Sequence, residues 1–230
     1  MVVLITGGSK GIGKATAYYF QSKGYKVIIT YNKSKESAKS MQNDGIDAFC
    51  CDVKDEKQVK NLFDYIYSKY NTLDIVINNA GICLMQKMLI DTTSEEFDEI
   101  FNVNVKGVYN ITKIYLQKAI YSQGKIINIT SIFAKKGGSC EVIYSSSKSG
   151  VSGFTRALSQ ELALSKVGVC ELSVGLVDTQ MNSHLSTSDK QEFIKEYNQK
   201  KVYEPLDVAK KIFNIAKKDS NIVNGKIYKI

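Results

Sequence analysis

Short apolar runs rich in valine and isoleucine recur along the chain, separated by longer stretches in which apolar and polar positions follow a helical period. The apolar runs lack the alternating polar residues of a sheet with one solvated face, so we expect strands that are covered on both faces. The expected strands are residues 2–6, 26–30, 47–51, 74–78, 125–130, 169–174 and 226–230.

The stretches between these runs predict helices at 13–23, 34–43, 55–70, 94–121 (as two helices), 144–164 and 205–217. Asp55 and Ser94 are the expected N-caps of two of them, and Pro205 suits the first turn of the last. Alternation of strand and helix requires right-handed crossovers. The predicted fold is therefore α/β: a Rossmann-like, doubly wound parallel sheet of about seven strands, with helices on both faces and ligands at the carboxyl ends of the strands.

A length of 230 residues suits one hydrophobic core, so we expect a single domain over residues 1–230. No repeat, linker or low-complexity block interrupts the alternation of elements. The long polar segment 176–203 shows no such pattern. We predict that it is an irregular lid over a substrate site, with a plain surface excursion as the alternative.

The net charge is +8, but Arg156 is the only arginine and the lysines are scattered. Phosphates and base edges are recognised best by arginine, so we interpret the charge as a solvated lysine-rich surface rather than a nucleic-acid site. The first residues run directly into the first motif, and no apolar run approaches the ~20 residues of a membrane span, so we expect a cytoplasmic protein. Five cysteines without paired spacing and a single histidine, His184, predict reduced thiols and no metal site.

The glycine-rich stretch "TGGSKGIGKAT", residues 6–16, is compatible with two kinds of phosphate loop. A triphosphate loop needs Ser or Thr after its lysine to ligate magnesium, but Ala15 follows Lys14. Later apolar strands end in Asn78-Asn79 and in Thr130 instead of an aspartate for the metal. A dinucleotide loop, in which glycines let the backbone approach a pyrophosphate at a helix N-terminus, is therefore the better interpretation.

Further motifs follow this loop in a fixed order. Gly7, Gly11 and Gly13 are followed by "NNAG" (78–81), "FNVNVKG" (101–107), a serine after the fifth expected strand and "VGLVDTQM" (174–181). This series resembles the short-chain dehydrogenase/reductase family over residues 2–181, and within it the bacterial 3-oxoacyl-(acyl-carrier-protein) reductases. The resemblance implies a catalytic set of Asn104, Ser131, Tyr144 and Lys148.

Tyr144 and Lys148 are one helical turn apart, so their side chains project from the same helix face. A phenol with a pKa of about 10 exchanges protons poorly near neutrality, and we expect the Lys148 ammonium and an oxidised nicotinamide to lower that pKa. By resemblance, Tyr144 protonates the ketone oxygen, Lys148 holds the nicotinamide ribose, Ser131 orients the substrate, and Asn104 holds a water that links Lys148 to solvent. Each of these residues alone has an ordinary structural explanation, but all four at the spacing of the family favour a catalytic function.

NADP is the expected cofactor. Tyr31, Asn32 and Lys33 follow the second expected strand without the carboxylate typical of NAD-preferring enzymes, whereas Lys10 and Lys33 could pair with a 2′-phosphate. Each charge-assisted bond contributes about 1.5–3 kcal/mol; generic surface lysines are the alternative. The cofactor-binding residues implied by the resemblance are Gly7, Ser9, Lys10, Gly11, Ile12, Gly13, Asn32, Lys33, Asp52, Val53, Asn79, Ala80, Gly81, Tyr144, Lys148, Gly175, Val177 and Thr179.

The resemblance implies hydride transfer from NADPH to a ketone, first of all a 3-oxoacyl group on an acyl carrier protein, as in fatty acid biosynthesis. A small carbonyl or sugar reductase, or a secondary-alcohol dehydrogenase, is the alternative, and a non-catalytic NADP-binding regulatory or scaffold protein is a third hypothesis. Lys166 matches a basic carrier contact of that group, but its companion position falls in 121–123, which holds no basic residue.

Three further expectations concern the surroundings of the site. Cys83 and Cys140 should flank the pocket as small apolar lining, and His184 should be exposed in the lid. Val174 stands where the family has a proline, so the resemblance does not define where the hinge of the lid lies. The family also implies a homo-oligomer, either a tetramer or a dimer.

Overall fold

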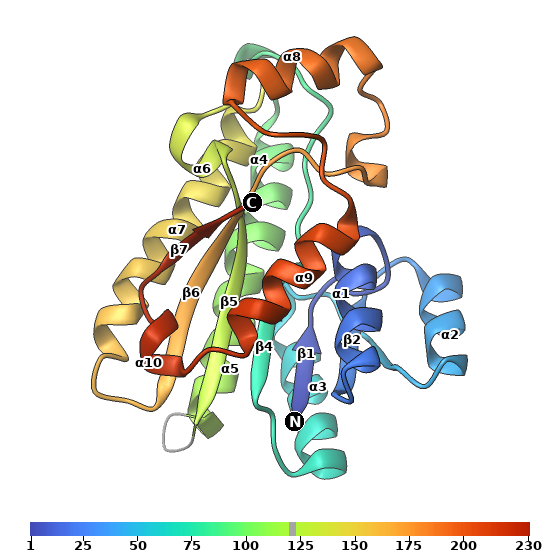
Figure 1. Cartoon of the computed structure of the whole chain (residues 1–230), viewed down its shortest axis with the longest axis vertical. Helices are drawn as coiled ribbons and strands as arrows, with labels where there is room; N and C mark the ends of the chain where they lie inside the picture. Colours follow the sequence, from blue (N-terminus) through green and yellow to red (C-terminus); the bar gives the residue numbers. More distant parts are fainter. Residues whose placement is uncertain (120–122) are drawn as a thin grey trace.

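Seven parallel strands form one sheet in the computed structural model, which describes residues 1–119 and 123–230 (Figure 1). The strand order is β3-β2-β1-β4-β5-β6-β7. The strands that follow β1 are added on one side of it up to β3 and on its other side from β4 onward. The strands are β1 (Val2–Ile5), β2 (Lys26–Tyr31), β3 (Asp47–Cys50), β4 (Ile75–Asn78), β5 (Gly124–Ser131), β6 (Val167–Val174) and β7 (Ile227–Lys229). The expected doubly wound α/β fold is confirmed, and each strand lies within a few residues of its expected place.

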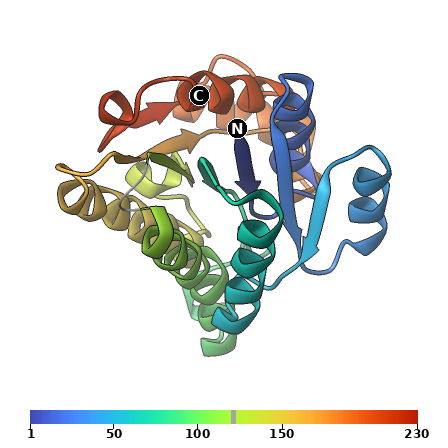
Figure 2. The same ribbon diagram turned by 90° about the horizontal axis from the view of Figure 1, so that it is seen from below.

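Helices cover both faces of the sheet (Figure 2). They are α1 (Gly11–Ser22), α2 (Lys35–Asn43), α3 (Glu56–Tyr70), α4 (Ser94–Phe101), α5 (Gly107–Ala119), α6 (Phe133–Lys136), α7 (Val142–Glu161), α8 (Thr187–Tyr197), α9 (Pro205–Ala216) and α10 (Ser220–Val223), with short turns η1 (Leu89–Asp91), η2 (Asn102–Lys106) and η3 (Gln180–Asn182). One apolar layer joins α1 and α9 to the sheet around Phe20 and Phe213, and the other joins α3 and α5 around Phe63 and Tyr115.

The helix boundaries follow local capping chemistry. The Asp55 carboxylate accepts hydrogen bonds from the backbone N–H groups of Lys57 and Gln58, as expected of an N-cap. Ser94 was the wrong choice for α4, because Thr93 forms a reciprocal capping box with Glu96. Pro205 occupies the first turn of α9, as expected.

The expected helical region 94–121 is two helices joined by the π-helical segment η2. Wider π turns place an extra residue in the helix and are frequent at functional sites. Asn104 lies in the middle of η2 and is buried. The last two positions of this expectation, 120 and 121, lie outside the described residues.

The segment 176–203 was expected to be irregular because it is polar. This prediction is wrong, since the segment contains η3 and the helix α8. Its two ends lie side by side, because Val177 forms a parallel β-bridge with Tyr203. The Gln199 side chain accepts a hydrogen bond from the Leu176 N–H at 2.8 Å and donates one to the Leu176 carbonyl at 2.9 Å. In Figure 1, α8 lies beyond the carboxyl ends of the strands, next to α6.

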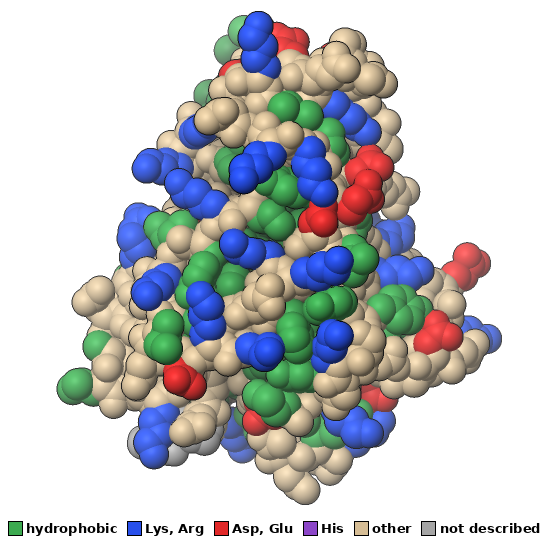
Figure 3. Space-filling model, viewed as in Figure 1, with side chains coloured by type: hydrophobic (Ala, Val, Ile, Leu, Met, Phe, Trp, Pro, Cys, Tyr) green, Lys and Arg blue, Asp and Glu red, His purple; other side chains and the backbone are tan. Residues whose placement is uncertain are grey.

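Lysine side chains lie singly and well spread over the face shown in Figure 3, with apolar and neutral groups between them. This distribution agrees with a solvated surface rather than with a continuous basic groove. Among the helices of the described residues, none has both the length and the apolar character needed to cross a bilayer.

Candidate active site

The glycine loop between β1 and α1 is a tight backbone turn. Gly7 and Gly11 have φ angles of +62° and +50°, which L-residues with a side chain rarely adopt. A Cβ atom at Gly13 would lie 2.5 Å from the Gly7 carbonyl oxygen, so only glycine allows the first turn of α1 to approach the loop. The resulting cradle of backbone N–H groups at a helix N-terminus fits a pyrophosphate.

The "NNAG" segment after β4 holds the glycine loop from the adjacent strand. The Thr6 hydroxyl accepts hydrogen bonds from the backbone N–H groups of Asn79 and Ala80, both at 3.0 Å. The Asn79 amide donates to the Thr6 and Gly7 carbonyls at 2.9 and 3.2 Å. Asn78 instead points to the sheet face covered by α5, where its amide donates to Asn128 of β5 at 2.8 Å and to Thr112 of α5 at 3.2 Å. The motif therefore fixes the loop at the crevice between β1 and β4, where doubly wound folds bind ligands.

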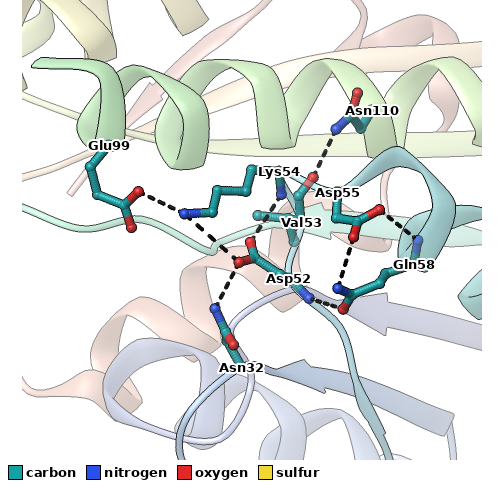
Figure 4. A network of polar contacts seen from close by, with 8 residues as sticks. All are labelled: Asn32, Asp52, Val53, Lys54, Asp55, Gln58, Glu99 and Asn110. Atoms are coloured by element: carbon teal, nitrogen blue, oxygen red, sulfur yellow. Dashed lines mark hydrogen bonds and ion pairs between the residues drawn. The ribbon is translucent and has the colours of Figure 1, made fainter. Parts of the chain in front are cut away.

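The loops after β2 and β3 are joined by a polar network (Figure 4). The Asn32 amide donates to the Asp52 carboxylate at 3.1 Å, and the Lys54 ammonium lies 3.9 Å from the same carboxylate. The Val53 carbonyl accepts a hydrogen bond from Asn110 of α5 at 2.9 Å. These contacts position the residues expected to lie around the adenosine part of the cofactor.

A cavity of about 630 Å³ runs from the glycine loop to the catalytic residues and beneath the segment 176–203. The expected site residues in its wall are Gly7, Lys10, Gly11, Ile12, Asn79, Ala80, Gly81, Ser131, Tyr144, Lys148, Gly175, Val177 and Thr179. The other expected residues are not part of this wall: Ser9, Gly13, Asn32, Lys33, Asp52, Val53 and Asn104. Lys10 and Lys33 are both exposed, and only Lys10 borders the cavity.

Three catalytic candidates converge on this cavity. Ser131 is the last residue of β5, and Tyr144 and Lys148 lie one turn apart on α7. The Lys148 Nζ atom donates to the Ile129 carbonyl at 3.1 Å and lies 5.7 Å from the centroid of the Tyr144 ring. Ser131 and Lys148 are both buried, and all three residues line the same cavity.

Burial shifts both titratable groups away from their charged forms. Desolvation raises the pKa of Tyr144, as do the nearby Cys83 and Glu141, and a hydrogen bond with Ser131 opposes this shift. Desolvation also lowers the pKa of Lys148 from 10.5 to about 8. The expected lowering of the Tyr144 pKa depends on an oxidised nicotinamide as well as on Lys148, so it stays a prediction for the complex with cofactor; in the chain alone, burial of the phenol raises the pKa.

Asn104 lies behind the catalytic residues rather than in the cavity wall. Its amide donates to the Ile82 carbonyl at 2.9 Å and to the Ser147 hydroxyl at 3.0 Å, and its oxygen accepts from the Ile82 N–H at 2.8 Å. A Cβ atom at Gly81 would lie 3.3 Å from that oxygen and 3.2 Å from Lys148 Nζ. Asn104 thus joins η2, α7 and the loop after β4 next to the lysine.

The sequence analysis missed several residues of the cavity wall. Glu141 lies one turn before Tyr144, a spacing from which its position could have been inferred. Phe193 comes from α8, which was not expected to be helical, and packs near Phe133 with ring centroids 5.8 Å apart. The remaining additions are Ile82, Leu84, Met85, Ile129, Thr130, Val174, Leu176, Gln180, Met181 and Asn182.

The two cysteines expected at the pocket differ in position. Cys83 lines the main cavity, as expected. Cys140 does not: it is exposed, has a φ angle of +58°, and borders a separate small hollow next to Glu141 and Tyr144. His184 is exposed at the edge of the cavity, in line with the expectation.

Lys166 lies far from the cavity within one chain. It immediately precedes β6, whose carboxyl end, at Val174, is at the site. The eight residues of β6 span about 26 Å at ~3.3 Å per residue, so Lys166 is at the opposite edge of the sheet. The companion position within 121–123 lies mostly outside the described residues.

Comparison with known proteins agrees with this geometry. A family model described as short chain dehydrogenase matches residues 1–190. The 3-oxoacyl-(acyl-carrier-protein) reductase FabG of Thermotoga maritima is 30% identical over 98% of this chain and 94% of its own, and that of Staphylococcus epidermidis is 29% identical over 96% and 93%.

Two solved structures superpose on the whole chain. ElxO with NADP bound has a TM-score of 0.90 at 30% identity and covers 100% of this chain and 96% of its own. The 3-ketoacyl-(acyl-carrier-protein) reductase of Brucella melitensis, in complex with NADH, has a TM-score of 0.91 at 27% identity, with the same coverage. The chain belongs to the short-chain dehydrogenase family and is an NAD(P)-dependent oxidoreductase.

Proposed function

We propose that this chain is an NADPH-dependent reductase that transfers hydride to a ketone, with 3-oxoacyl thioesters as the first substrate class. The observation that carries the proposal is the convergence of Ser131, Tyr144 and Lys148 on one cavity that continues to the glycine loop. The two 3-oxoacyl-(acyl-carrier-protein) reductases similar over nearly the whole chain support the substrate class.

Each catalytic side chain has a distinct role in this proposal. The Ser131 hydroxyl donates a hydrogen bond to the ketone oxygen and so orients it and stabilises the negative charge that develops there. Tyr144 donates a proton to the same oxygen. Lys148 binds the ribose hydroxyls and, while protonated, stabilises the phenolate that Tyr144 becomes. The nicotinamide supplies the hydride when bound.

Asn104 is a positioning residue in this scheme. Its contacts with Ile82 and Ser147 hold the loop after β4 against α7, which fixes the surroundings of Lys148. We also assign to Asn104 the water that connects Lys148 with bulk solvent, so that Tyr144 can regain its proton after each turnover.

NADP rather than NAD is the proposed cofactor, because the chain has no carboxylate at 31–33 where a ribose 2′-hydroxyl would be bound. Asp52 nearby is engaged by Asn32. Replacing Lys10 and Lys33 together by Ala should raise the dissociation constant of NADPH by about tenfold or more and that of NADH by less than about twofold. Fluorescence titration measures both constants, and equal weakening of the two cofactors would contradict the assignment.

A small carbonyl reductase is the second candidate, and one observation favours it. The Glu141 carboxyl group lies in the cavity wall, where a simple acyl chain offers it no partner. Lys166, the residue expected to contact a carrier, lies at the opposite edge of the sheet from the cavity of its own chain. A carrier docked there would therefore serve the cavity of another copy in an oligomer.

Oxidation of NADPH, followed by its absorbance with acetoacetyl-CoA as substrate, tests the reaction. Tyr144→Phe should lower kcat by at least about a hundredfold while leaving the dissociation constant of NADPH within about twofold, because proton transfer contributes 10²–10⁴-fold. Tyr109→Phe, at an exposed tyrosine of α5, is the matched control and should have no effect. Activity of Tyr144→Phe near the level of the unmodified protein would refute the proposal.

A further inference from the structure

One carboxyl group lies in the substrate cavity next to the catalytic tyrosine. Glu141 is the N-cap residue of α7, and it lines both the main cavity and the small hollow beside it. Its side chain is half-buried. Glu141 therefore borders a molecule bound in the cavity, one helical turn from Tyr144.

No cation of the described chain neutralises Glu141. Within residues 1–119 and 123–230, its carboxylate has no ion pair with Lys, Arg or His at 4.0 Å or less. Lys87 borders the small hollow but is paired with Glu96 at 2.6 Å, and Lys148 donates to the Ile129 carbonyl. The hydrogen-bond partner of the Glu141 carboxylate is the neutral side chain of Gln86.

Glu141 is close enough to Tyr144 for its charge to affect the pKa of that tyrosine. Desolvation raises the pKa of Glu141 to about 7, with the Gln86 hydrogen bond acting in the opposite direction. Its charge in turn raises the pKa values of Tyr144 and Cys83. The titratable groups around it are Cys83 and Lys87 from the loop after β4, Cys140 from the turn before α7, and Tyr144 and Lys148 from α7, and His184 of the segment 176–203 lines the same cavity.

A partly desolvated carboxylate without a counter-ion is costly, and a cation brought by a ligand would offset that cost. Leu84 and Met85 line both the cavity and the hollow together with Glu141, and the rings of Phe133 and Phe193 also line the cavity. Such a combination suits a hydrophobic ring or short chain that carries one positively charged nitrogen. An anionic substrate would meet repulsion at the same place.

We propose that Glu141 is a specificity-determining residue that binds a cationic nitrogen of the substrate, so that this chain reduces small amino ketones in preference to neutral ketones of the same shape. This inference rests on the ketone reduction proposed above but extends it beyond acyl thioesters. A purely structural role for Glu141 can be distinguished from this one, because Glu141→Gln keeps a hydrogen-bonding group for Gln86 and loses only the charge.

The test compares two ring ketones of equal shape, the dimethyl-oxopiperidinium cation and dimethylcyclohexanone, with NADPH. The unmodified protein should reduce the cation with a kcat/KM at least about tenfold higher, mainly through a lower KM, since a tenfold ratio requires only about 1.4 kcal/mol. Glu141→Gln should bring the ratio of the two kcat/KM values to about one, because any effect of the substitution on Tyr144 is shared by both ketones. Glu161→Gln, at an exposed carboxylate near the end of the same helix, should change neither.

The pH dependence separates charge from shape. Because the cation is permanently charged, its advantage should increase as Glu141 ionises through pH 7 and should be constant with pH in Glu141→Gln. Equal kcat/KM for the two ketones, reduction of acetoacetyl-CoA but of neither ring ketone, or an unchanged ratio in Glu141→Gln would each overturn the inference and leave the reductase intact. Failure to reduce any of the three compounds would overturn both.

Discussion

Lys148 shows at the level of one residue how the site is prepared at the expense of stability. Its ammonium group is buried beside the cavity with one carbonyl, that of Ile129, as its hydrogen-bond acceptor. Desolvation lowers its pKa from 10.5 to about 8, so the folded protein disfavours the charged form that the reaction uses. Functional sites commonly retain such unfavourable groups.

Removing this charge should stabilise the protein without cofactor. The cost of burying the charged Lys148 is present in full below pH 8, where the lysine is charged in both the folded and the unfolded state. This cost disappears as the pH rises toward 10.5. One pKa unit corresponds to about 1.4 kcal/mol, so Lys148→Met should increase the free energy of unfolding at pH 7 by about 1–3 kcal/mol, after loss of the Ile129 hydrogen bond.

Chemical denaturation at pH 7 and at pH 9.5 measures this difference, and the gain should be smaller at the higher pH. Lys60→Met, at an exposed lysine of α3, is the control and should change stability little at either pH. A lower stability of Lys148→Met at pH 7 would show that the lysine contributes more by its contacts than it costs by its charge.

At the scale of elements, the glycine loop and α1 form one unit that depends on the absence of a side chain at Gly13. A Cβ atom there would lie 2.5 Å from the Gly7 carbonyl oxygen and 2.6 Å from the Asn79 amide nitrogen. Gly13→Ala should therefore lower the free energy of unfolding by about 2 kcal/mol or more and should abolish high-affinity NADPH binding.

The matched change is Gly150→Ala in α7, where the nearest atom to a new Cβ is 3.7 Å away. Because alanine favours a helix over glycine by about 1 kcal/mol, this variant should be slightly more stable. Thermal unfolding and NADPH titration of both variants test the difference. Equal behaviour of Gly13→Ala and Gly150→Ala would mean that the loop can move away from α1.

Elements with a strong local signal were predictable from the sequence, and those that depend on distant contacts were not. The Val- and Ile-rich runs that form strands, and the spacing of one helical turn between Tyr144 and Lys148, are local features of the sequence. The helix α8 was missed because its residues are mostly polar, although Ser186 and Asp189 form a capping box that the sequence displays. Cys140 was misplaced because its left-handed backbone conformation is not visible in the residue type.

The site shows the same division. The glycine loop and the helix face shared by Tyr144 and Lys148 are visible in the sequence because each is contiguous or one helical turn long, whereas Ser131 reaches the same cavity from β5. The position of Glu141 one turn before Tyr144 could be inferred from the sequence, but the other walls of its cavity, the loop after β4 and the segment 176–203, come together only in the folded chain. Burial raises the pKa of Tyr144 in the packed molecule, an effect that the spacing of Tyr144 and Lys148 in the sequence does not reveal.

On the scale of the whole molecule, the sheet ends in an open edge at β7. This strand pairs with β6 alone among the described residues, and Ile222 and Ile227 beside the edge are about half exposed. Unprotected edges and exposed apolar side chains are typical of surfaces that associate.

We expect the protein to form a dimer or tetramer that covers this edge. Ile227→Lys should shift the molecular mass in solution toward that of one chain, because it introduces a charge into the contact. Leu164→Lys, at a fully exposed leucine after α7, is the control and should have no effect. Light scattering after size-exclusion chromatography measures the mass, and a single-chain mass for the unmodified protein would contradict the expectation.

The bridge between Val177 and Tyr203 has a practical consequence for how new specificities arise. The chain leaves the sheet and returns to it at one point, so everything between these residues is an excursion whose replacement leaves the strand register untouched. Relatives could therefore exchange residues 180–202, which change the substrate side of the cavity, while Thr179 stays beside Gly11 at the nucleotide loop.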